Sequence, residues 1–434
     1  MNQASMQEGS VEVIAAKPVG RGMLRPFKVR NFNLLLSGQT ISIIGDALYM
    51  VALPWLILTT GGNAQELGIV LAAYGIPRAA STLAGGWLSD HLRPRQLMLI
   101  ADTVRMLLVG ILAVLAFQGH PIFWQLCAIA VPLGALSGAF TPATLSIVPE
   151  ILSSDDLQAG NGLWMSFLQG ANLIGSAFAG VIVATLSTGG GLAIDAATFL
   201  ASAVSLALMR TISHAHPFTS GKQEMAESQG LASIDTGEQS EQISFWHFLL
   251  TSRLIQATVL MFMVISIVSG GVIEVALPTL VHGPFHSSAS SYGFIMAGWG
   301  AGSLIGSVFA GMLGQYKHKG MAVLLAGLIV SAAIALLPTW GVIGAIACML
   351  IGGLANSGVT VLLFTAIQLA IPRHLMGRIM GLLMFSASGL YPFSVALAGV
   401  LSNHFGPAIL FPFGGLLLAL VMLFGMTQKA LREI

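Results

Sequence analysis

Charged side chains within long apolar stretches are the groups of this sequence that could take part in chemistry. Asp46 lies near the middle of an apolar stretch at 33–60, and Arg78 lies at a matching position of the next one, at 67–89. Inside a membrane each such group costs about 2.5–3.5 kcal/mol or more, so it needs a partner or a function. We predict that Asp46 and Arg78 meet, either as a static ion pair between two helices or as a site for substrate or a proton.

Polar residues accompany Asp46 along the same stretch. Ser42 and Tyr49 are four and three residues away from it, and Gln39 lies one further turn along. Residues at this spacing lie on nearby faces of a helix. We expect this polar stripe to face a cavity or a partner helix, with Gln39 and Tyr49 belonging to the same substrate or coupling-ion site as Asp46.

Glu274 is another carboxylate within an apolar stretch, at 256–281. No basic residue is predicted at the same depth, so the charge of Glu274 has no evident partner. A carboxylate in this setting suits a proton-coupled step or the recognition of a cationic substrate. The alternative is that Glu274 lies close enough to the membrane surface to be hydrated.

A further group of charged residues surrounds the junction between the second and third apolar stretches. Its members are Asp90, Arg93, Arg95, Asp102 and Arg105. Asp102 and Arg105 are three residues apart, which places them on one helix face, where they can pair. The alternative for the group as a whole is a solvated loop with ordinary basic charges.

Several motifs of known chemistry do not occur in the sequence. It contains no GxxxxGK[ST] phosphate-binding loop, no catalytic triad spacing and no dinucleotide fingerprint. Cys127 and Cys348 lie in apolar stretches without the spacing of metal ligands. We therefore predict no enzymatic activity, no cofactor and no metal site, and we expect an ion gradient or the substrate's own gradient as the energy source.

The composition indicates what surrounds these groups. Of the 434 residues, 55% are hydrophobic and 8% are charged, whereas a soluble domain carries about 25% charged residues. The natural solvent of such a chain is lipid. The formal net charge of +1 gives no general attraction to nucleic acid, so we predict membrane lipid and a small-molecule substrate as partners.

Apolar segments long enough to cross a bilayer core of about 30 Å recur along the whole chain. We predict twelve transmembrane helices, at 33–60, 67–89, 96–118, 121–146, 159–186, 191–210, 256–281, 292–314, 320–340, 342–369, 379–402 and 407–427. Short turn signals rich in Gly, Pro and Asn separate most of them. The predicted fold class is an all-α membrane protein.

The polar segments divide the chain into two bundles of six helices. We expect a tail at 1–31, a bundle at 32–210, a linker at 211–244, a second bundle at 245–428 and a tail at 429–434. Outside the predicted helices, Lys and Arg fall in the tails, in the linker and in every second loop. The positive-inside rule then places both termini in the cytoplasm of a cell that carries this protein in its plasma membrane.

The two bundles resemble each other in sequence. The segment 51–57, Val-Ala-Leu-Pro-Trp-Leu-Ile, matches 275–281, Val-Ala-Leu-Pro-Thr-Leu-Val. Tyr74 and Trp299 align between the repeats to within one residue, and they could line a cavity or serve packing. In the following helices, Gly68, Gly75 and Gly86 fall opposite Gly293, Gly300 and Gly311. Two parallel six-helix repeats are an arrangement found in transporters.

The segment 86–95, Gly-Trp-Leu-Ser-Asp-His-Leu-Arg-Pro-Arg, resembles the loop signature of the major facilitator superfamily. Segments resembling its branch of macrolide and enterobactin exporters lie at 38–46, 139–143, 194–199 and 377–378. The resemblance covers nearly the whole chain and implies the major facilitator fold. It also implies a conformational latch, a contact that holds the two halves in one conformation. The residues of the expected latch are Gly86, Asp90, Arg93, Arg95, Asp102 and Arg105.

Together these features predict a secondary active transporter. The leading hypothesis is a monomeric exporter of a small hydrophobic drug-like or siderophore-like molecule, working by alternating access and able to couple to protons. One alternative is uptake, or translocation of a lysolipid, on the same fold. Another is a non-transporting membrane sensor that signals through the linker at 211–244.

Overall fold

The described residues of the computed structural model fold almost entirely into helices. They are residues 24–91, 93–119, 121–153, 156–210, 249, 251–312, 319–370, 379, 382–383, 385–386 and 388–428. The first elements are η1 (Arg25–Lys28), α1 (Arg30–Thr59), α2 (Ala64–His91), α3 (Pro94–Phe117), α4 (Phe123–Ile151) and α5 (Leu157–Leu208). The predicted linker at 211–244 and the tail at 429–434 lie outside the described residues, as does most of the tail at 1–31.

The second half of the chain continues with a further series of helices. Its elements are α8 (Arg253–Val268), η2 (Ser269–Ala276), α9 (Leu277–His282), α10 (Ala289–Met312), α11 (Lys319–Leu336), α12 (Gly341–Ala370), α14 (Tyr391–Phe405), η5 (Pro407–Ile409) and α15 (Leu410–Thr427). The three elements α8, η2 and α9 follow one another without a break and form a single path, which corresponds to the helix predicted at 256–281.

The prediction of transmembrane helices is confirmed. Six described stretches are long and apolar enough to cross a membrane, and two shorter apolar helices, Gly320–Leu336 and Gly341–Ser357, add to them. One of the six, Ala159–Leu208, has 50 residues, whereas about 20 suffice for one crossing. The backbone of α5 turns at Ser187, where φ is 69°, so this element contains both helices predicted at 159–186 and 191–210.

Two of the predicted helices differ from the structure in their winding. The path at 256–281 changes from α-helical to π-helical at η2 before it becomes α-helical again. The helix predicted at 379–402 is not continuous, because residues 389–390 form a turn and α14 begins at Tyr391. Pro392 in the first turn of α14 explains this position, since proline lacks the N–H that an internal helical position would need.

Large apolar side chains cover the outer surface of the helices. Ile343 is 83% exposed and Trp124 is 74% exposed. Contiguous exposed apolar surface of this extent is unfavourable in water, whereas lipid accommodates it. The outward-facing residues thus agree with the lipid environment that the composition predicts.

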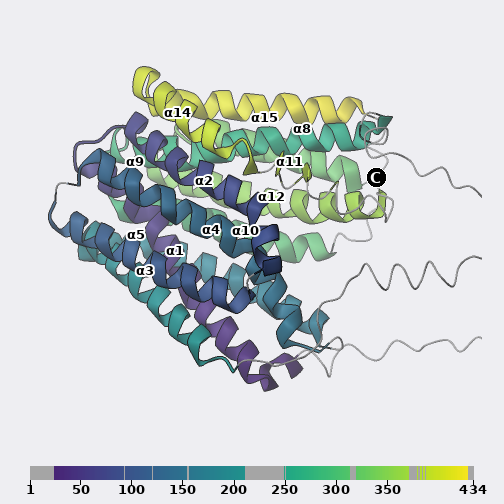
Figure 1. Cartoon of the computed structure of the whole chain (residues 1–434). Helices are drawn as coiled ribbons and strands as arrows, with labels where there is room; N and C mark the ends of the chain where they lie inside the picture. The colour runs from purple at the N-terminus through teal and green to yellow at the C-terminus, as the bar shows by residue number, and fades with distance from the viewer. Residues whose placement is uncertain are drawn as a thin grey trace, which may run out of the picture.

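The helices pack as two sets, and the main contacts between the sets are made by two pairs of helices. In the first set α1 and α3 pack on α5, and α2 packs on α4; in the second, α12 packs on α10 and α11, and α15 packs on α11 and α8. The sets meet where α2 packs against α14 and where α5 packs against α10. Figure 1 shows the two sets diverging toward the side on which the C-terminus is marked.

Glycines bring the two sets into close contact near one end of the molecule. A Cβ atom on Gly68 of α2 would lie 2.5 Å from the carbonyl oxygen of Val395 and 3.0 Å from the Cα of Gly399, both on α14. A Cβ atom on Gly180 of α5 would lie 2.7 Å from the Cα of Gly293 on α10. Small residues allow such backbone contact between membrane helices.

Candidate functional site

A cavity of about 510 Å³ lies where the two sets of helices meet. Tyr49 of α1 lines it from the first set, and most of the other lining residues belong to the second set. Tyr292, Met296 and Trp299 of α10 contribute aromatic and thioether side chains. Among the described residues that line the cavity, Glu274 alone is an acidic or basic one. The cavity can therefore hold a mostly apolar molecule and offers it one carboxylate.

Glu274 projects from the π-helical segment η2 and has a partner that the sequence did not predict. The hydroxyl of Tyr391, the first residue of α14, donates a hydrogen bond to Glu274 Oε2. Gly271 of η2 allows this approach, since a Cβ there would lie 2.8 Å from the Cβ of Ala398 and 2.9 Å from Ser394 Oγ. π-helical turns are frequent at functional sites. Glu274 is thus a polar group of the cavity wall, held by a hydroxyl and not by a basic residue.

Asp46 and Arg78 do not form the ion pair predicted for them. The ion pair among the described residues joins Arg105 Nη1 to Asp102 Oδ1, at 3.7 Å. The side chains of Asp46 and Arg78 are both exposed, and Asp46 lies one turn before Tyr49 of the cavity wall on α1. The charge of Asp46 interacts with both Arg105 and Arg78.

Arg78 is a base whose charge acts on carboxylates of both halves. Its positive charge interacts with Asp46 and also with Glu274. Its guanidinium lies over the ring of Tyr74, with 5.8 Å between Cζ and the ring centroid. Arg78 therefore links the polar groups of the two halves by charge, although it forms no ion pair with Asp46 among the described residues.

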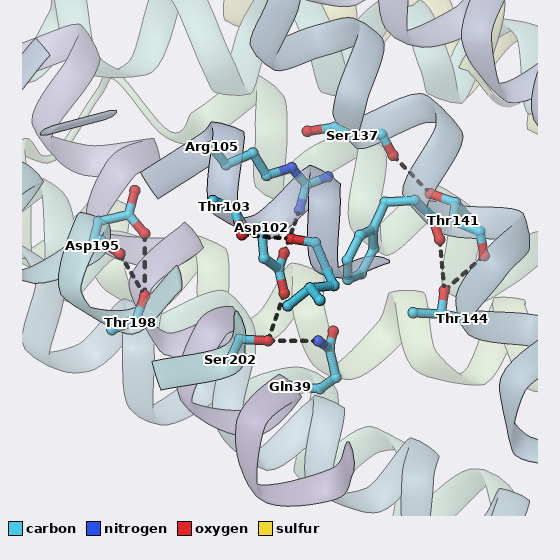
Figure 2. A network of polar contacts seen from close by, with 12 residues as sticks. Gln39, Asp102, Thr103, Arg105, Ser137, Thr141, Thr144, Asp195, Thr198 and Ser202 are labelled. Atoms are coloured by element: carbon cyan, nitrogen blue, oxygen red, sulfur yellow. Dashed lines mark hydrogen bonds and ion pairs between the residues drawn. The ribbon is translucent and has the colours of Figure 1, made fainter. Parts of the chain in front are cut away.

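A buried chain of polar contacts connects α1, α3 and α5, as Figure 2 shows. Gln39 Nε2 donates to Ser202 Oγ at 2.9 Å, and Ser202 Oγ donates to Asp102 Oδ2 at 2.6 Å. Asp102 is 0% exposed and Gln39 is 4% exposed. The predicted polar stripe of α1 thus divides, because Tyr49 faces the cavity whereas Gln39 faces a partner helix.

Arg105 is the basic residue of this buried region. Its guanidinium forms the ion pair with Asp102 and lies 4.5 Å from the ring centroid of Phe140 and 5.6 Å from that of Phe199. Its Nε atom has no hydrogen-bond partner among the described residues. The aromatic faces offer some compensation for the loss of water around the guanidinium.

The members of the expected latch whose side chains the structure describes do not form one group. Asp102 and Arg105 pair as predicted, but they lie in the interior of the first set of helices. Arg95 donates from Nε and Nη2 to the carbonyl oxygens of Leu206 and Ala207 at the end of α5. Gly86 and Asp90 lie in α2, and their side chains are outside the described residues.

Two residues of the site were not chosen from the sequence. Asp195 of α5 is 0% exposed and lies in the segment 194–199, which was noted only for its resemblance. As an ionisable residue in an apolar stretch it satisfied the criterion that selected Asp46. Tyr391 carried no such signal, because its role depends on contact with Glu274, 117 residues away.

Comparison with known proteins identifies a family and several relatives of this chain. A family model described as Major Facilitator Superfamily matches residues 35–393. Multidrug efflux pump Tap of Mycobacterium tuberculosis (strain ATCC 25618 / H37Rv) is 26% identical over 394 residues, which are 87% of this chain and 90% of that protein. Enterobactin exporter EntS of Escherichia coli O1:K1 / APEC is 23% identical over 356 residues, which are 81% of this chain and 80% of that protein.

Solved structures of transporters are also similar to this chain over most of its length. A bacterial homologue of the iron transporter ferroportin in an inward-facing state has a TM-score of 0.66 and 14% identity, covering 92% of this chain and 99% of its own. The nucleoside transporter NupG has a TM-score of 0.68 and 11% identity, covering 92% of this chain and 99% of its own. At such identities the likeness shows a shared fold.

Proposed function

The chain belongs to the Major Facilitator Superfamily, and from that premise we propose that it is a secondary active exporter of small, largely apolar molecules that carry a positive charge. Transporters of this family are multi-pass membrane proteins, and the two halves of such a carrier rock about a central site. Export is supported by the similarity over most of the chain to Tap, a multidrug efflux pump, and to EntS, an enterobactin exporter.

The observation that carries the choice of substrate is the central cavity. Its described walls are apolar and aromatic, with Glu274 as their one charged residue. An apolar cation gains from both features, because the walls bury its surface and the carboxylate compensates its charge. An anionic siderophore would place its charge against Glu274, so we propose a drug-like cation as the substrate class.

The conformation fits the state in which an exporter takes up its substrate, a state that an uptake carrier also passes through. The two halves touch near Gly68 and Gly180, at the end of the molecule where the loops at 60–63 and 283–288 lie. Arg25 and Arg95 lie at the opposite end of their helices. If the positive-inside rule sets the orientation, this conformation is closed to the outside and substrate enters the cavity from the cytoplasm.

We assign the coupling of transport to a proton gradient to Asp46. Its side chain is exposed one turn before Tyr49 of the cavity wall, and its charge interacts with Arg105 and Arg78. A carboxylate that changes its protonation state there changes the net charge that the substrate meets. Binding of the proton and of a cationic substrate would then compete, which is the requirement for antiport.

Efflux of ethidium from pump-deficient bacterial cells that express this chain tests the proposal, with and without a protonophore. We expect protonophore-sensitive efflux, which Asp46→Asn abolishes at unchanged expression. Glu274→Gln should raise the concentration of ethidium needed for half-maximal efflux, because the cation loses its counter-charge. An uncharged hydrophobic probe should be affected less by Glu274→Gln than ethidium is.

Glu150→Gln is the matched control, because it removes an exposed carboxylate at the end of α4 and should leave efflux unchanged. Undiminished efflux by Asp46→Asn would remove Asp46 from the mechanism. Accumulation of the probes in place of efflux would contradict export, and siderophore export without cation export would contradict the substrate class.

A further inference from the structure

Asp195 is a buried carboxylate that the proposed function does not use. Its Oδ2 atom has no hydrogen-bond partner among the described residues, and its side chain is 0% exposed. Its Oδ1 atom accepts a 3.4 Å hydrogen bond from Thr198 Oγ1, which also donates to the backbone oxygen of Asp195 at 2.7 Å. One hydroxyl serves both acceptors, so an anionic Asp195 would be poorly stabilised.

Helix α1 touches Asp195 at Gly45. A Cβ atom on Gly45 would overlap Thr198 Oγ1 and would lie 2.5 Å from Asp195 Oδ1. Glycine is therefore required for the two helices to approach this closely. Asp46 is the next residue of α1, and its side chain is exposed, one turn before Tyr49 of the cavity wall. The residue of α1 that touches the buried Asp195 is thus the direct neighbour of an exposed carboxylate.

The charged and titratable groups around Asp195 come from the two helices packed against it. Asp46 and Tyr49 belong to α1, whereas Arg105 belongs to α3. Arg105 already pairs with Asp102, and one guanidinium cannot balance two buried carboxylates. A buried charge without a counter-charge is costly, and a bound proton removes that cost.

We propose that Asp195 is a proton-binding residue of the transport cycle and that it exchanges its proton with the cavity through Asp46. This inference rests on the proposed function, because it adds a second carboxylate to proton-coupled export. It assigns different roles to the two residues: Asp46 meets the cavity, whereas Asp195 stores the proton inside the first set of helices.

The exchange moves one proton between two carboxyl groups. The O–H bond of protonated Asp46 breaks and an O–H bond forms at Oδ2 of Asp195, so Asp195 becomes neutral and Asp46 becomes an anion. Arg105 and Arg78 stabilise the negative charge of Asp46 in this state. An ionised Asp46 favours the binding of a cation in the cavity, and the reverse transfer removes that charge and favours release.

Infrared titration of the purified full-length protein in lipid nanodiscs tests the proton site without any substrate. We expect the C=O stretching band of a protonated, dehydrated carboxylic acid, which disappears as the pH rises. Asp195→Asn should remove this band, and Asp195→Glu should keep it at a shifted frequency. Thr198→Val is the matched control, since it changes the hydrogen bond and leaves the carboxyl group, so the band should remain.

A band that is unchanged in both Asp195→Asn and Asp195→Glu would overturn the proposal. A band that responds to Na⁺ at constant pH would also overturn it, because Asp195 would then belong to a sodium site. The Asp195→Glu variant retains a carboxyl group, so the test stands even where Asp195→Asn does not yield folded protein.

Transport of ethidium in everted membrane vesicles tests the coupling. Asp195→Asn should lose accumulation driven by a proton gradient and keep the exchange of ethidium at equal concentrations, which needs no net proton movement. Loss of both activities in a folded variant would contradict the proton-storage role. Absence of ethidium transport by the unchanged protein, together with an Asp195-dependent infrared band, would reject the proposed function and retain the proton site.

Discussion

The side chain of Arg105 contacts several groups in the first set of helices. It pairs with Asp102 at 3.7 Å, and its guanidinium lies against the rings of Phe140 and Phe199. Its charge also interacts with Asp46 and Asp195. Arg105 interacts with several carboxylates of this region, so its removal leaves more than one of them with less compensation.

Substitution of Arg105 alone should therefore cost more stability than substitution of Arg105 together with Asp102. We expect Arg105→Met to lower the free energy of unfolding by about 3–5 kcal/mol, because it leaves the buried Asp102 unpaired. The double variant Arg105→Met with Asp102→Asn should recover part of this loss. The measurement is an unfolding titration in mixed micelles with increasing dodecyl sulfate. Strictly additive effects of the two substitutions would show that the pair is not coupled.

At the scale of elements, the end of α5 depends on residues from other helices. Arg95 of α3 donates two hydrogen bonds, at 2.8 Å to the carbonyl oxygen of Leu206 and at 2.9 Å to that of Ala207. Asn31 of α1 donates to the carbonyl oxygen of Arg210 at 3.0 Å. The last carbonyl groups of a helix have no partner within it, and a basic side chain there satisfies them.

Arg95 should accordingly stabilise the fold, whereas its neighbour Arg93 should not. We expect Arg95→Gln to lower the free energy of unfolding by about 1–3 kcal/mol, since charged hydrogen bonds are lost. Arg93→Gln should stay within about 0.5 kcal/mol, because Arg93 is exposed. Equal effects of both substitutions in the same unfolding titration would argue against the capping role and favour a shared role in the latch.

At the scale of the whole molecule, the contacts between the two halves are close only where glycines permit them. Gly68 meets Val395 and Gly399, and Gly180 meets Gly293, near the same end of the helices. Alternating access requires that such contacts open when the other end closes. Side chains placed at these glycines therefore oppose this conformation without altering the interior of either half.

Gly68→Val should shift the population toward a conformation that is open at this end. A Cβ at Gly68 would lie 2.5 Å from a backbone oxygen of α14, which cannot move aside by a rotamer change. Distances between spin labels on Asn63→Cys and His404→Cys measure the shift, in a background that lacks the free cysteines Cys127 and Cys348.

Gly110→Val provides the control for this measurement, because a Cβ at Gly110 has no neighbour within 4 Å. The label distances should then match those of the unchanged protein. Identical distance distributions for Gly68→Val and Gly110→Val would contradict the view that the glycine contacts hold this conformation.

The membrane environment, the apolar segments and the two-fold repeat could be predicted from the sequence alone. The first two depend on composition over a window of about 20 residues, and the repeat depends on matching residues such as 51–57 and 275–281; neither requires knowledge of the packing. Asp46 and Glu274 could be selected for the same reason, because a charge in an apolar segment stands out without knowledge of its surroundings. The π-helical turn around Glu274, which lies where η2 packs against α14, could not be predicted from the sequence. The break before Tyr391 has a local signal in Pro392, but the predicted helix at 379–402 did not take it into account.

The tertiary structure decided which charged groups meet. Asp46 was expected to pair with Arg78, but the ion pair among the described residues joins Arg105 to Asp102, and Glu274 meets the hydroxyl of Tyr391. Rotation and depth of each helix determine such partners, and these follow from packing between segments that lie far apart in the chain. The sequence by itself determined that this protein crosses a membrane and carries charges there; packing determined which of those charges reach the cavity and which are buried.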